Sequence, residues 1–387
     1  MNSRCSAMGS FYSILIVSRR LNLDQSAPKC SFGLAKSLLR LGLKVHVLTS
    51  FAEPSLVDSL RVLGGIIHHV NPRLSSRMSA PILLSLYVKY IKRKYGIDVV
   101  IGNGYTICDD ITWIHFPRYG WIEALMNLGE SIPRSLRVEA LAEKILFSTS
   151  RYLLAVSNLV KNILLKYYDI DEERIIENYN GVDTDYYYPL PSDVRDGLRR
   201  KMGYDGSILI LYNGGISRRK GFDILLRELS EAKYKKEMKV IVAGLGLHNF
   251  EHAKSVIRKY GLEDVAILKG WLETQDLRML YQISDFFTLP SIFDPFSLAT
   301  LEAMACGSIP IVSRYAGTAE IVKNGVNGFV IDPLHEGEIA SMLDGIASSL
   351  GRLSTIRERA IETAKEFSWD NVARDLIVKL RKKGLIS

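Results

Sequence analysis

The sequence is poor in cysteine and has no long apolar run. Its four cysteines, Cys5, Cys30, Cys108 and Cys306, form no C-x-x-C pair and have no regular spacing. This pattern disfavours a disulfide framework or a zinc site and fits a reducing compartment. No stretch approaches the roughly 20 apolar residues of a membrane span, and the apolar run at 14–17 is too short for the core of a signal peptide. We therefore expect a cytoplasmic protein.

Motifs for metal and cofactor chemistry are also missing. The sequence has no H-E-x-x-H run, no Cys/His grouping and no aspartate pair at the end of a predicted strand, so we expect neither a metal nor a cofactor. The first predicted strand is not followed by G-x-G-x-x-G, which argues against a dinucleotide-dependent dehydrogenase. No lysine is marked for pyridoxal phosphate, and this disfavours a glycan phosphorylase.

The chain is long enough for two domains, and its charge is unevenly distributed. A length of 387 residues suggests two domains that each bury their own core. The net charge is +8, and residues 36–94 hold ten basic and two acidic residues, so this segment carries the whole excess. Such a bias indicates a surface for anions, lipid headgroups or nucleic acid. The alternative is a solvated face that only aids solubility.

Strand-like and helix-like segments alternate along the first half. A helix predicted at 32–41 is followed by Gly42 and by a strand at 44–48, a β-α-β start that is typical of a parallel, doubly wound sheet. The segment 25–31 reads as a loop without glycine. Other strands are predicted at 12–17, 66–70, 99–102, 112–116 and 151–156.

The second half repeats this alternation after a polar linker. The linker is predicted at 191–206, where charge is high and apolar periodicity is absent, and the last helix at 371–383. We therefore expect an α/β protein with two Rossmann-like, doubly wound domains that face each other across a cleft. Their limits are set at 1–190 and 191–366, with a C-terminal helix in 367–387.

The segment 288–310 carries the strongest functional signal. A strand ends at Pro290 and a short helix begins near residue 297, so the first backbone N–H groups of that helix have no partner within it. Together with the helix dipole they form a phosphate site, built from Ser297, Leu298 and Ala299. Glu302 lies one turn further, where it can accept from sugar hydroxyls, and Asp294 precedes the helix. The alternative is an ordinary strand–loop–helix unit with a surface acid and a capping serine.

A second group of candidates lies at 214–221, between a predicted strand and a predicted helix. A glycine turn is followed there by Arg218, Arg219 and Lys220. Such cations can neutralise the negative charge that gathers on a leaving diphosphate. Because the helix dipole disfavours cations at a helix start, at least one of the three should have an anionic partner. Otherwise they are solvated charges.

These residues resemble the signature of the family 4 glycosyltransferases, which have the GT-B fold. The run DPFSL at Asp294 is similar to the family's EPFGL-type run, with Asp for Glu and Ser297 for Gly. Lys220 and the glycine after it match the family's K-G pair. Gly215 stands where the family usually has Arg, and Arg219 is the best candidate to replace that cation. The segment 175–189 resembles the family's interdomain hinge.

The resemblance implies a retaining hexosyltransferase that uses a UDP- or GDP-sugar, a glycan or lipid-linked acceptor and no divalent metal. In that mechanism Glu302 holds the ribose, Asp294 the donor sugar, and Lys220 with Arg219 the diphosphate. His115, at the end of the strand at 112–116, matches a family histidine that contacts the donor sugar, although a lone histidine in an apolar run can also be core. No nucleic acid is expected as a partner.

The resemblance also implies that two further positions face the nucleotide, Gly244 in a short turn and Trp271 beside the base. Trp271 could equally belong to the core. Three departures from the family leave other functions open: the missing Arg at Gly215, the glycine-free segment 25–31 and the shorter acid at Asp294. The alternatives are a catalytically idle nucleotide-sugar-binding partner and another GT-B enzyme, such as a nucleotide-sugar epimerase.

The segment 81–95 is the best candidate for acceptor or membrane contact. Its apolar residues recur at helical spacing, and four basic residues gather towards its end. A basic amphipathic helix is typical of membrane-surface binding, which would make the protein membrane-peripheral. The alternative is a helix that covers the sheet and has a basic tip.

Overall fold

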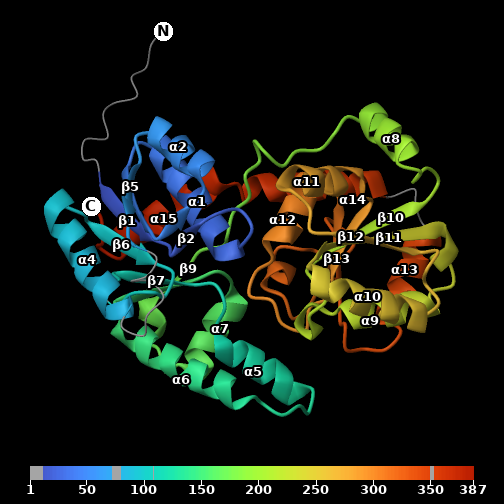
Figure 1. Cartoon of the computed structure of the whole chain (residues 1–387), viewed down its shortest axis with the longest axis horizontal. Helices are drawn as coiled ribbons and strands as arrows, with labels where there is room; N and C mark the ends of the chain where they lie inside the picture. Colours follow the sequence, from blue (N-terminus) through green and yellow to red (C-terminus); the bar gives the residue numbers. More distant parts are fainter. Residues whose placement is uncertain (1–11, 72–79, 108, 349–352) are drawn as a thin grey trace, which may run out of the picture.

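The computed structural model describes residues 12–71, 80–107, 109–348 and 353–387. Its strands form two large sheets, which lie in the left and right lobes of Figure 1. Every strand pairing recorded in the two sheets is parallel. Helices cover the sheets on both faces, as expected for sheets whose strands are buried apolar runs. The predicted α/β class with two doubly wound units is confirmed.

The first sheet has seven strands in the order β5-β3-β1-β6-β7-β8-β9. The chain moves from β1 outwards to β5 and then returns to β6 on the other side of β1, so the strand order reverses between β1 and β6. Ligands bind at such a switch point in open α/β sheets. In spatial order the strands are Ile66–His69, Lys44–Thr49, Ser13–Val17, Val99–Gly102, Ile111–Ile114, Tyr152–Ala155 and Ile175–Glu177. A small separate ribbon pairs β2 (Arg20–Leu21) with β4 (Phe51–Ala52).

The helices of the first half follow the predicted alternation with one clear difference. Helix α1 begins at Ser26, so the prediction of a loop over 25–31 is wrong. Gln25 has extended backbone angles and ends the loop, and Pro28 is tolerated because it lies in the first turn. The helices are α1 (Ser26–Arg40), α2 (Pro54–Val62), α4 (Ala80–Tyr95), α5 (Arg118–Asn127), α6 (Arg134–Thr149) and α7 (Asn158–Tyr167). A short 3-10 turn, η1 (Glu172–Arg174), precedes β9.

The second sheet has six strands in the order β12-β11-β10-β13-β14-β15, and its order reverses between β10 and β13. In spatial order these strands are Ala266–Gly270, Met238–Leu245, Ile208–Asn213, Phe286–Leu289, Ile309–Ser313 and Phe329–Ile331. The second half also has 3-10 turns at η2 (Arg218–Lys220), η3 (Lys235–Glu237) and η4 (Gly317–Glu320). The carboxyl ends of β10 and β13 therefore mark the second expected ligand site.

The predicted linker at 191–206 is in large part a helix, α8 (Ser192–Lys201), so that prediction is wrong. Arg195 and Arg199 of α8 reach Asp285, at 2.6 and 2.9 Å. The helix is held by these tertiary ion pairs rather than by an apolar face, and sequence periodicity could not reveal them. The other helices are α9 (Phe222–Glu231), α10 (Leu247–Lys259), α11 (Thr274–Ile283), α12 (Leu298–Ala305), α13 (Glu338–Ser348), α14 (Leu353–Glu366) and α15 (Trp369–Lys382).

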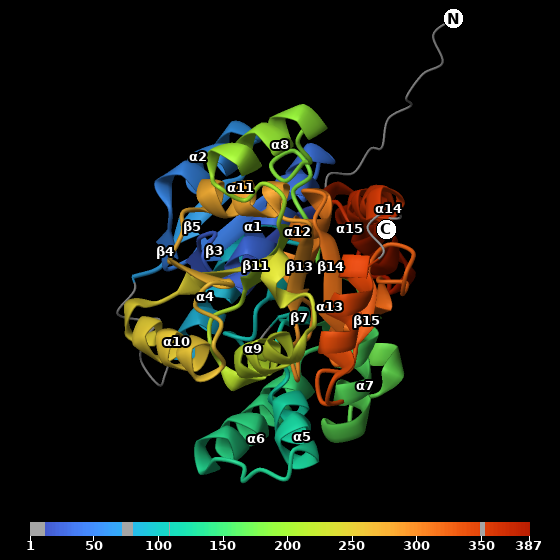
Figure 2. The same ribbon diagram turned by 90° about the vertical axis from the view of Figure 1, so that its right-hand side faces the viewer.

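The last helix, α15, lies beside α1 in the first lobe, whereas α14 belongs to the second lobe (Figures 1 and 2). Ser368 caps α15 by accepting from Asn371 N. The indole of Trp369 packs directly against Gly33, where a Cβ atom would come within 2.3 Å of the ring. Ser37 of α1 donates to Asp370 at 2.5 Å. The domain limits at 190 and 366 stay predictions.

Helix α4 has two apolar sides. Leu84, Val88 and Ile91 are buried under the first sheet. Ile82 and Leu86 are exposed on the opposite side, at 57% and 59%. Among the described residues no helix is long and apolar enough to cross a membrane.

Candidate active site

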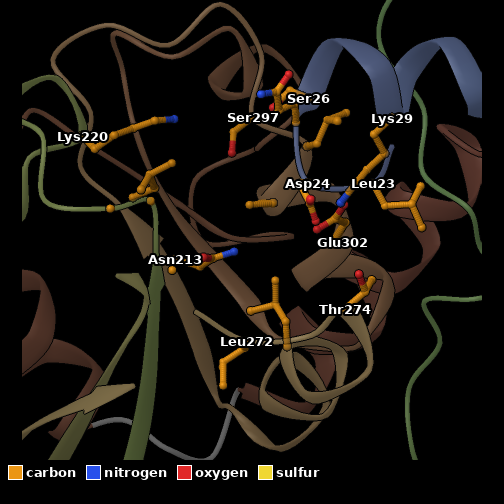
Figure 3. A pocket seen from close by; sticks show the side chains of 18 of the residues that line it. Leu23, Asp24, Ser26, Lys29, Asn213, Lys220, Leu272, Thr274, Ser297 and Glu302 are labelled. Atoms are coloured by element: carbon orange, nitrogen blue, oxygen red, sulfur yellow. The ribbon is translucent and has the colours of Figure 1, made fainter. Parts of the chain in front are cut away.

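A cavity of about 360 Å³ lies where β10 and β13 end, at the switch point of the second sheet. Helix α1 of the first lobe closes it on one side, so both halves of the chain line it (Figure 3). His115 and Arg219 are not among its lining residues. The cavity brings together the other predicted site residues: Gly215, Lys220, Gly244, Trp271, Asp294, Ser297, Leu298, Ala299 and Glu302.

The glycine turn after β10 fits tightly against the loop after β13. Gly221 has a φ of +72°, and a Cβ atom there would lie 2.0 Å from the Pro290 carbonyl oxygen. Only glycine combines that backbone conformation with such a close approach. Gly215 also has a positive φ, +65°, and its carbonyl accepts from the Tyr212 hydroxyl at 2.5 Å. The turn is thereby fixed, and it directs Lys220 into the cavity (Figure 3).

The three consecutive cations point in three directions. The Lys220 ammonium donates to Asp294 at 2.5 Å, and burial lowers the pKa of Lys220 although Asp294 opposes this effect. The Arg219 guanidinium donates to the Phe293 carbonyl at 2.9 Å and lies 3.9 Å from Asp294. Arg218 forms an ion pair with Glu130 of the first lobe. Each cation has an anionic partner, but only Lys220 lines the cavity.

The amino end of α12 opens into the same cavity. Ser297 is the N-cap rather than the first helical residue, and its hydroxyl accepts from Thr300 N at 3.3 Å. Within the described part of the chain the N–H groups of Leu298 and Ala299 have no acceptor. The helix ends before Gly307, whose φ is +84°. Two free N–H groups at a helix start form an anion site.

Glu302 lies at the other end of the cavity, in a chain of hydrogen bonds that the sequence did not predict. Only 4% of this residue is exposed, and its carboxylate accepts from Lys29 of α1 at 2.8 Å and from Tyr281 at 3.3 Å. Asn213 donates to the Tyr281 hydroxyl at 3.0 Å. Burial raises the pKa of Tyr281, so its hydroxyl stays protonated and donates to Glu302. Figure 3 shows Lys29 reaching from α1 towards Glu302.

Three residues of this chain of hydrogen bonds, Asn213, Lys29 and Tyr281, were not predicted from the sequence, and they differ in the signal that the sequence carries for each. Asn213 is a polar residue at a strand end directly before the glycine turn, which is a position where ligands are expected. Lys29 was hidden because its segment was taken for a loop. Tyr281 gave no signal, because its apolar ring fits the buried face of α11.

His115 lies beside a different cavity. Its Nε2 is 3.3 Å from Asn103 Oδ1, and its ring packs on Trp113 with centroids 4.7 Å apart. Burial lowers the pKa of His115 to about 3, so the ring is neutral at pH 7. Asn103 in turn lines a cavity of about 240 Å³ at the ends of β1 and β6.

Trp271 is 60% exposed at the cavity rim, so it is not a core residue. Glu320 links the two lobes elsewhere by accepting from the backbone N–H groups of Asn158 and Leu159, at 2.9 and 2.8 Å. It therefore caps α7 and lines neither cavity. Among the described residues no group of three or more His, Cys, Asp or Glu is placed to hold a metal ion.

Two family models match the chain, one for each half. The model described as "Glycosyltransferase Family 4" matches residues 30–186, and "Glycosyl transferases group 1" matches residues 195–367. The chain belongs to the family 4 glycosyltransferases. As a member of this family it uses nucleotide sugars.

Other proteins and solved structures resemble this glycosyltransferase over nearly its full length. An uncharacterized glycosyltransferase, MJ1607 of Methanocaldococcus jannaschii, is 25% identical over 89% of this chain and 91% of its own. HepE of Anabaena, solved with UDP-glucose, has a TM-score of 0.74 at 19% identity, with 96% and 99% covered. Sucrose-phosphate synthase of Thermosynechococcus elongatus has a TM-score of 0.78 at 16% identity, with 97% and 100% covered. The predicted GT-B fold is confirmed.

Proposed function

We propose that this glycosyltransferase moves a hexose from a nucleoside-diphosphate sugar to a glycan or lipid-linked acceptor, with retention of configuration. One observation carries the proposal: a partly buried lysine, a free helix start and a buried carboxylate all line a single interlobe cavity. The HepE structure, which contains UDP-glucose, supports a UDP-hexose as the first donor to test.

Each group in the cavity then has a role. Lys220 and the N–H groups of Leu298 and Ala299 bind the diphosphate, where positive charge stabilises the leaving group most. Asp294 binds the donor sugar hydroxyls, and Glu302 binds the ribose. Gly215, Gly244 and Trp271 face the nucleotide, and Ser297 fixes the helix start. Arg219 adds positive charge from behind Asp294, at 3.9 Å from that carboxylate.

The two buried carboxylates of the cavity are poorly placed to be nucleophiles. Asp294 is held by Lys220 and Arg219, and Glu302 is held by Lys29 and Tyr281. A double displacement of the kind that retaining hydrolases use needs a free carboxylate. We therefore infer a front-side displacement: the acceptor oxygen bonds to the anomeric carbon, the bond to the phosphate oxygen breaks, and the acceptor proton passes to the leaving diphosphate.

A donor panel tests the proposal. The full chain is mixed with UDP-, GDP- and ADP-hexoses, and Tm is measured, because a bound donor stabilises the folded state. Donors that raise Tm are then assayed for transfer and for hydrolysis, with Lys220→Ala as the inactive control. Binding without any turnover would favour the idle nucleotide-sugar-binding partner. Conversion of the donor to an epimer without an acceptor would favour the epimerase.

We also propose that α4 touches an anionic membrane surface and brings the enzyme to lipid-linked acceptors. Its exposed apolar residues Ile82, Leu86 and Tyr90 recur every four residues along one side, and it ends in Lys92, Arg93 and Lys94. Lys92 is paired with Asp110 at 2.6 Å and is not available. Apolar residues beside cations match a surface with anionic headgroups over acyl chains.

Vesicle co-sedimentation tests this contact. Wild type should bind vesicles with phosphatidylglycerol, bind pure phosphatidylcholine poorly, and release at high salt. The triple variant Ile82→Ser, Leu86→Ser, Tyr90→Ser should bind these vesicles with an affinity at least about tenfold lower, because three apolar side chains are lost. A matched triple on α6, Val138→Ser, Leu141→Ser, Ile145→Ser, removes an equally exposed stripe (67%, 56% and 64%). Equal loss in both triples, or no loss in the first, would contradict a contact through α4.

A further inference from the structure

A second cavity, of about 240 Å³, lies at the switch point of the first sheet, where β1 and β6 end. It adjoins the 360 Å³ cavity that we propose for the donor, called the donor cavity below, because Gln25 lines both. Its volume is two-thirds of that of the donor cavity, so it suits a sugar-sized group rather than a second nucleotide. Its lining is Ser18, Arg19, Arg20, Gln25, Ala27, Pro28, Asn103 and Tyr105.

Two arginines dominate the charge of this cavity. Arg19 and Arg20 are exposed, and no acidic residue lines the cavity with them. The nearest acid in the sequence, Asp24, lines the donor cavity instead. Their backbone is fixed, because the Arg19 carbonyl accepts from Ser50 N at 3.1 Å and the Arg20 carbonyl accepts from the Ser18 hydroxyl at 2.6 Å.

Other cations near the cleft are already paired. Lys29 is paired with Glu302, and two further cations of α1, Lys36 and Arg40, are paired with Asp183 and Asp185. By contrast, within the described ranges no carboxylate lies within ion-pair distance of Arg19 or Arg20. Two arginines that line one cavity and have no internal ion-pair partner are available for an anion from outside.

The opposite wall offers neutral hydrogen-bonding groups in fixed positions. Asn103 donates to Ser31 at 2.8 Å and to Ser18 at 3.3 Å, and its oxygen faces His115 Nε2. Tyr105 is 41% exposed at the rim. These groups suit hydroxyls, whereas the arginines suit an anion. The cavity thus has a charged end and a neutral polar end.

We propose that this cavity binds the acceptor and that the acceptor carries a phosphate group, held by Arg19 and Arg20. The inference rests on the proposed transferase function and names its acceptor class. Guanidinium groups match phosphate oxygens in charge and in their bidentate geometry, and a phosphate monoester carries about −1.5 to −2 charges at pH 7. The phosphate belongs either to a free sugar phosphate or to a lipid headgroup, and the chemistry at the arginines is the same.

The test uses the full chain and the donor that passes the panel above. Soluble acceptors are compared in pairs: glucose with glucose 6-phosphate, mannose with mannose 6-phosphate, and inositol with inositol 1-phosphate. The lipid arm compares vesicles of phosphatidylinositol with vesicles of phosphatidylcholine. The double variant Arg19→Gln, Arg20→Gln is compared with Arg134→Gln, Arg137→Gln, which removes two exposed arginines of α6 that line neither cavity.

Phosphorylated acceptors should be used at least tenfold better than their unphosphorylated partners. The Arg19/Arg20 variant should lower kcat/KM for them by about tenfold to a hundredfold, because hydrogen bonds to charged groups are worth that much. The loss should lie in the acceptor KM, while the same donor still raises Tm as in wild type. The α6 variant should behave as wild type. Activity with soluble phosphates identifies a free acceptor, and activity with phosphatidylinositol alone identifies a lipid headgroup.

The proposal is overturned if wild type uses the unphosphorylated partners equally well, or if the Arg19/Arg20 variant keeps its acceptor KM. It is also overturned if the donor is hydrolysed but none of the phosphate-bearing probes accepts sugar. A protein that neither binds nor hydrolyses any donor would instead refute the transferase function itself. The two failures are therefore distinguishable.

Discussion

The crevices at the ends of the two sheets share a topology but differ in how their charges are satisfied. In the second sheet, Lys220 is paired with Asp294 at 2.5 Å, and Glu302 is paired with Lys29 at 2.8 Å. In the first sheet, Arg19 and Arg20 lie in a cavity without any acidic lining residue. Both crevices lie at switch points, so topology alone does not explain the contrast.

This contrast indicates that the charges of the second-sheet crevice are preorganised, whereas those of the first-sheet crevice depend on a ligand. Buried charges must be compensated within the protein. The buried carboxylates of Asp294 and Glu302 are compensated by their lysine partners. In the proposed function, an entering donor exchanges these internal pairs for its own diphosphate and hydroxyls. Exposed arginines are solvated and need no internal partner. In the proposal above, the acceptor supplies the anion that pairs with them. Substitutions at four positions, Asp294, Glu302, His115 and Trp271, test this contrast.

The largest effect is expected for Asp294→Asn. It leaves Lys220 without a charged partner at 2.5 Å, and it replaces one of the two oxygens that we propose for the donor sugar hydroxyls with an NH2 group, which cannot accept a hydrogen bond. We expect kcat for transfer to fall by about a hundredfold or more, the size seen when one preorganised polar group is removed from an active site. Asp294→Glu supplies the acid usual in the family and should stay within about tenfold of wild type. Similar kcat values in Asp294→Asn and wild type would reduce the Lys220 pair to a structural feature.

Glu302→Gln should act on donor affinity instead. The neutral amide cannot match the carboxylate as an acceptor for ribose hydroxyls, so donor KM should rise by about tenfold to a hundredfold. The change in kcat should be smaller than the change in KM. Glu320→Gln is the matched control, because Glu320 also joins the lobes but lines neither cavity. It should lower Tm and leave donor KM unchanged; a rise in both variants would point to lobe packing rather than to donor contact.

His115→Ala and His115→Gln test whether His115 acts on the acceptor or on the donor. Through Asn103, the histidine should affect the acceptor: we expect the alanine variant to raise acceptor KM by up to about tenfold, the worth of one neutral hydrogen bond. The glutamine variant can still donate to Asn103 and should remain near wild type. A matching rise in donor KM would show instead that His115 contacts the donor sugar, as the family resemblance implies.

The same histidine predicts a pH effect on stability. Its folded pKa is lowered to about 3, below the ordinary value of 6.5, so the unfolded state binds the proton more readily. Its contribution is fully present above pH 6.5 and is lost as pH falls towards 3. His115→Gln should flatten the decline of Tm over this interval, and an unchanged decline would assign it to other groups.

The sequence predicted those residues of the two crevices whose signal lies within one short segment, and it missed those that depend on contacts between distant segments. Asp294, Ser297 and Lys220 lie in short runs whose strand–turn–helix context is itself local, and the structure brings them together. Lys29 contacts Glu302 across 273 positions of the chain, and no pattern within one segment reports such a pair. Arg19 and Arg20 were passed over because an exposed cation next to a strand resembles any solvated charge. Ion-paired helix α8 was missed for the same reason.

The smallest effect is expected for Trp271→Ala. The family resemblance implies that this residue lies beside the base, and its side chain is 60% exposed. Donor KM should stay within about threefold of wild type and Tm should not change, because an exposed side chain is usually worth about 0.5 kcal/mol or less. Trp369→Ala, which empties a site that is 94% buried, should lower stability by about 3 kcal/mol or more. If Trp271→Ala raised donor KM more than tenfold, the base would be held by a side chain after all, and the second crevice would share the first one's dependence on exposed groups.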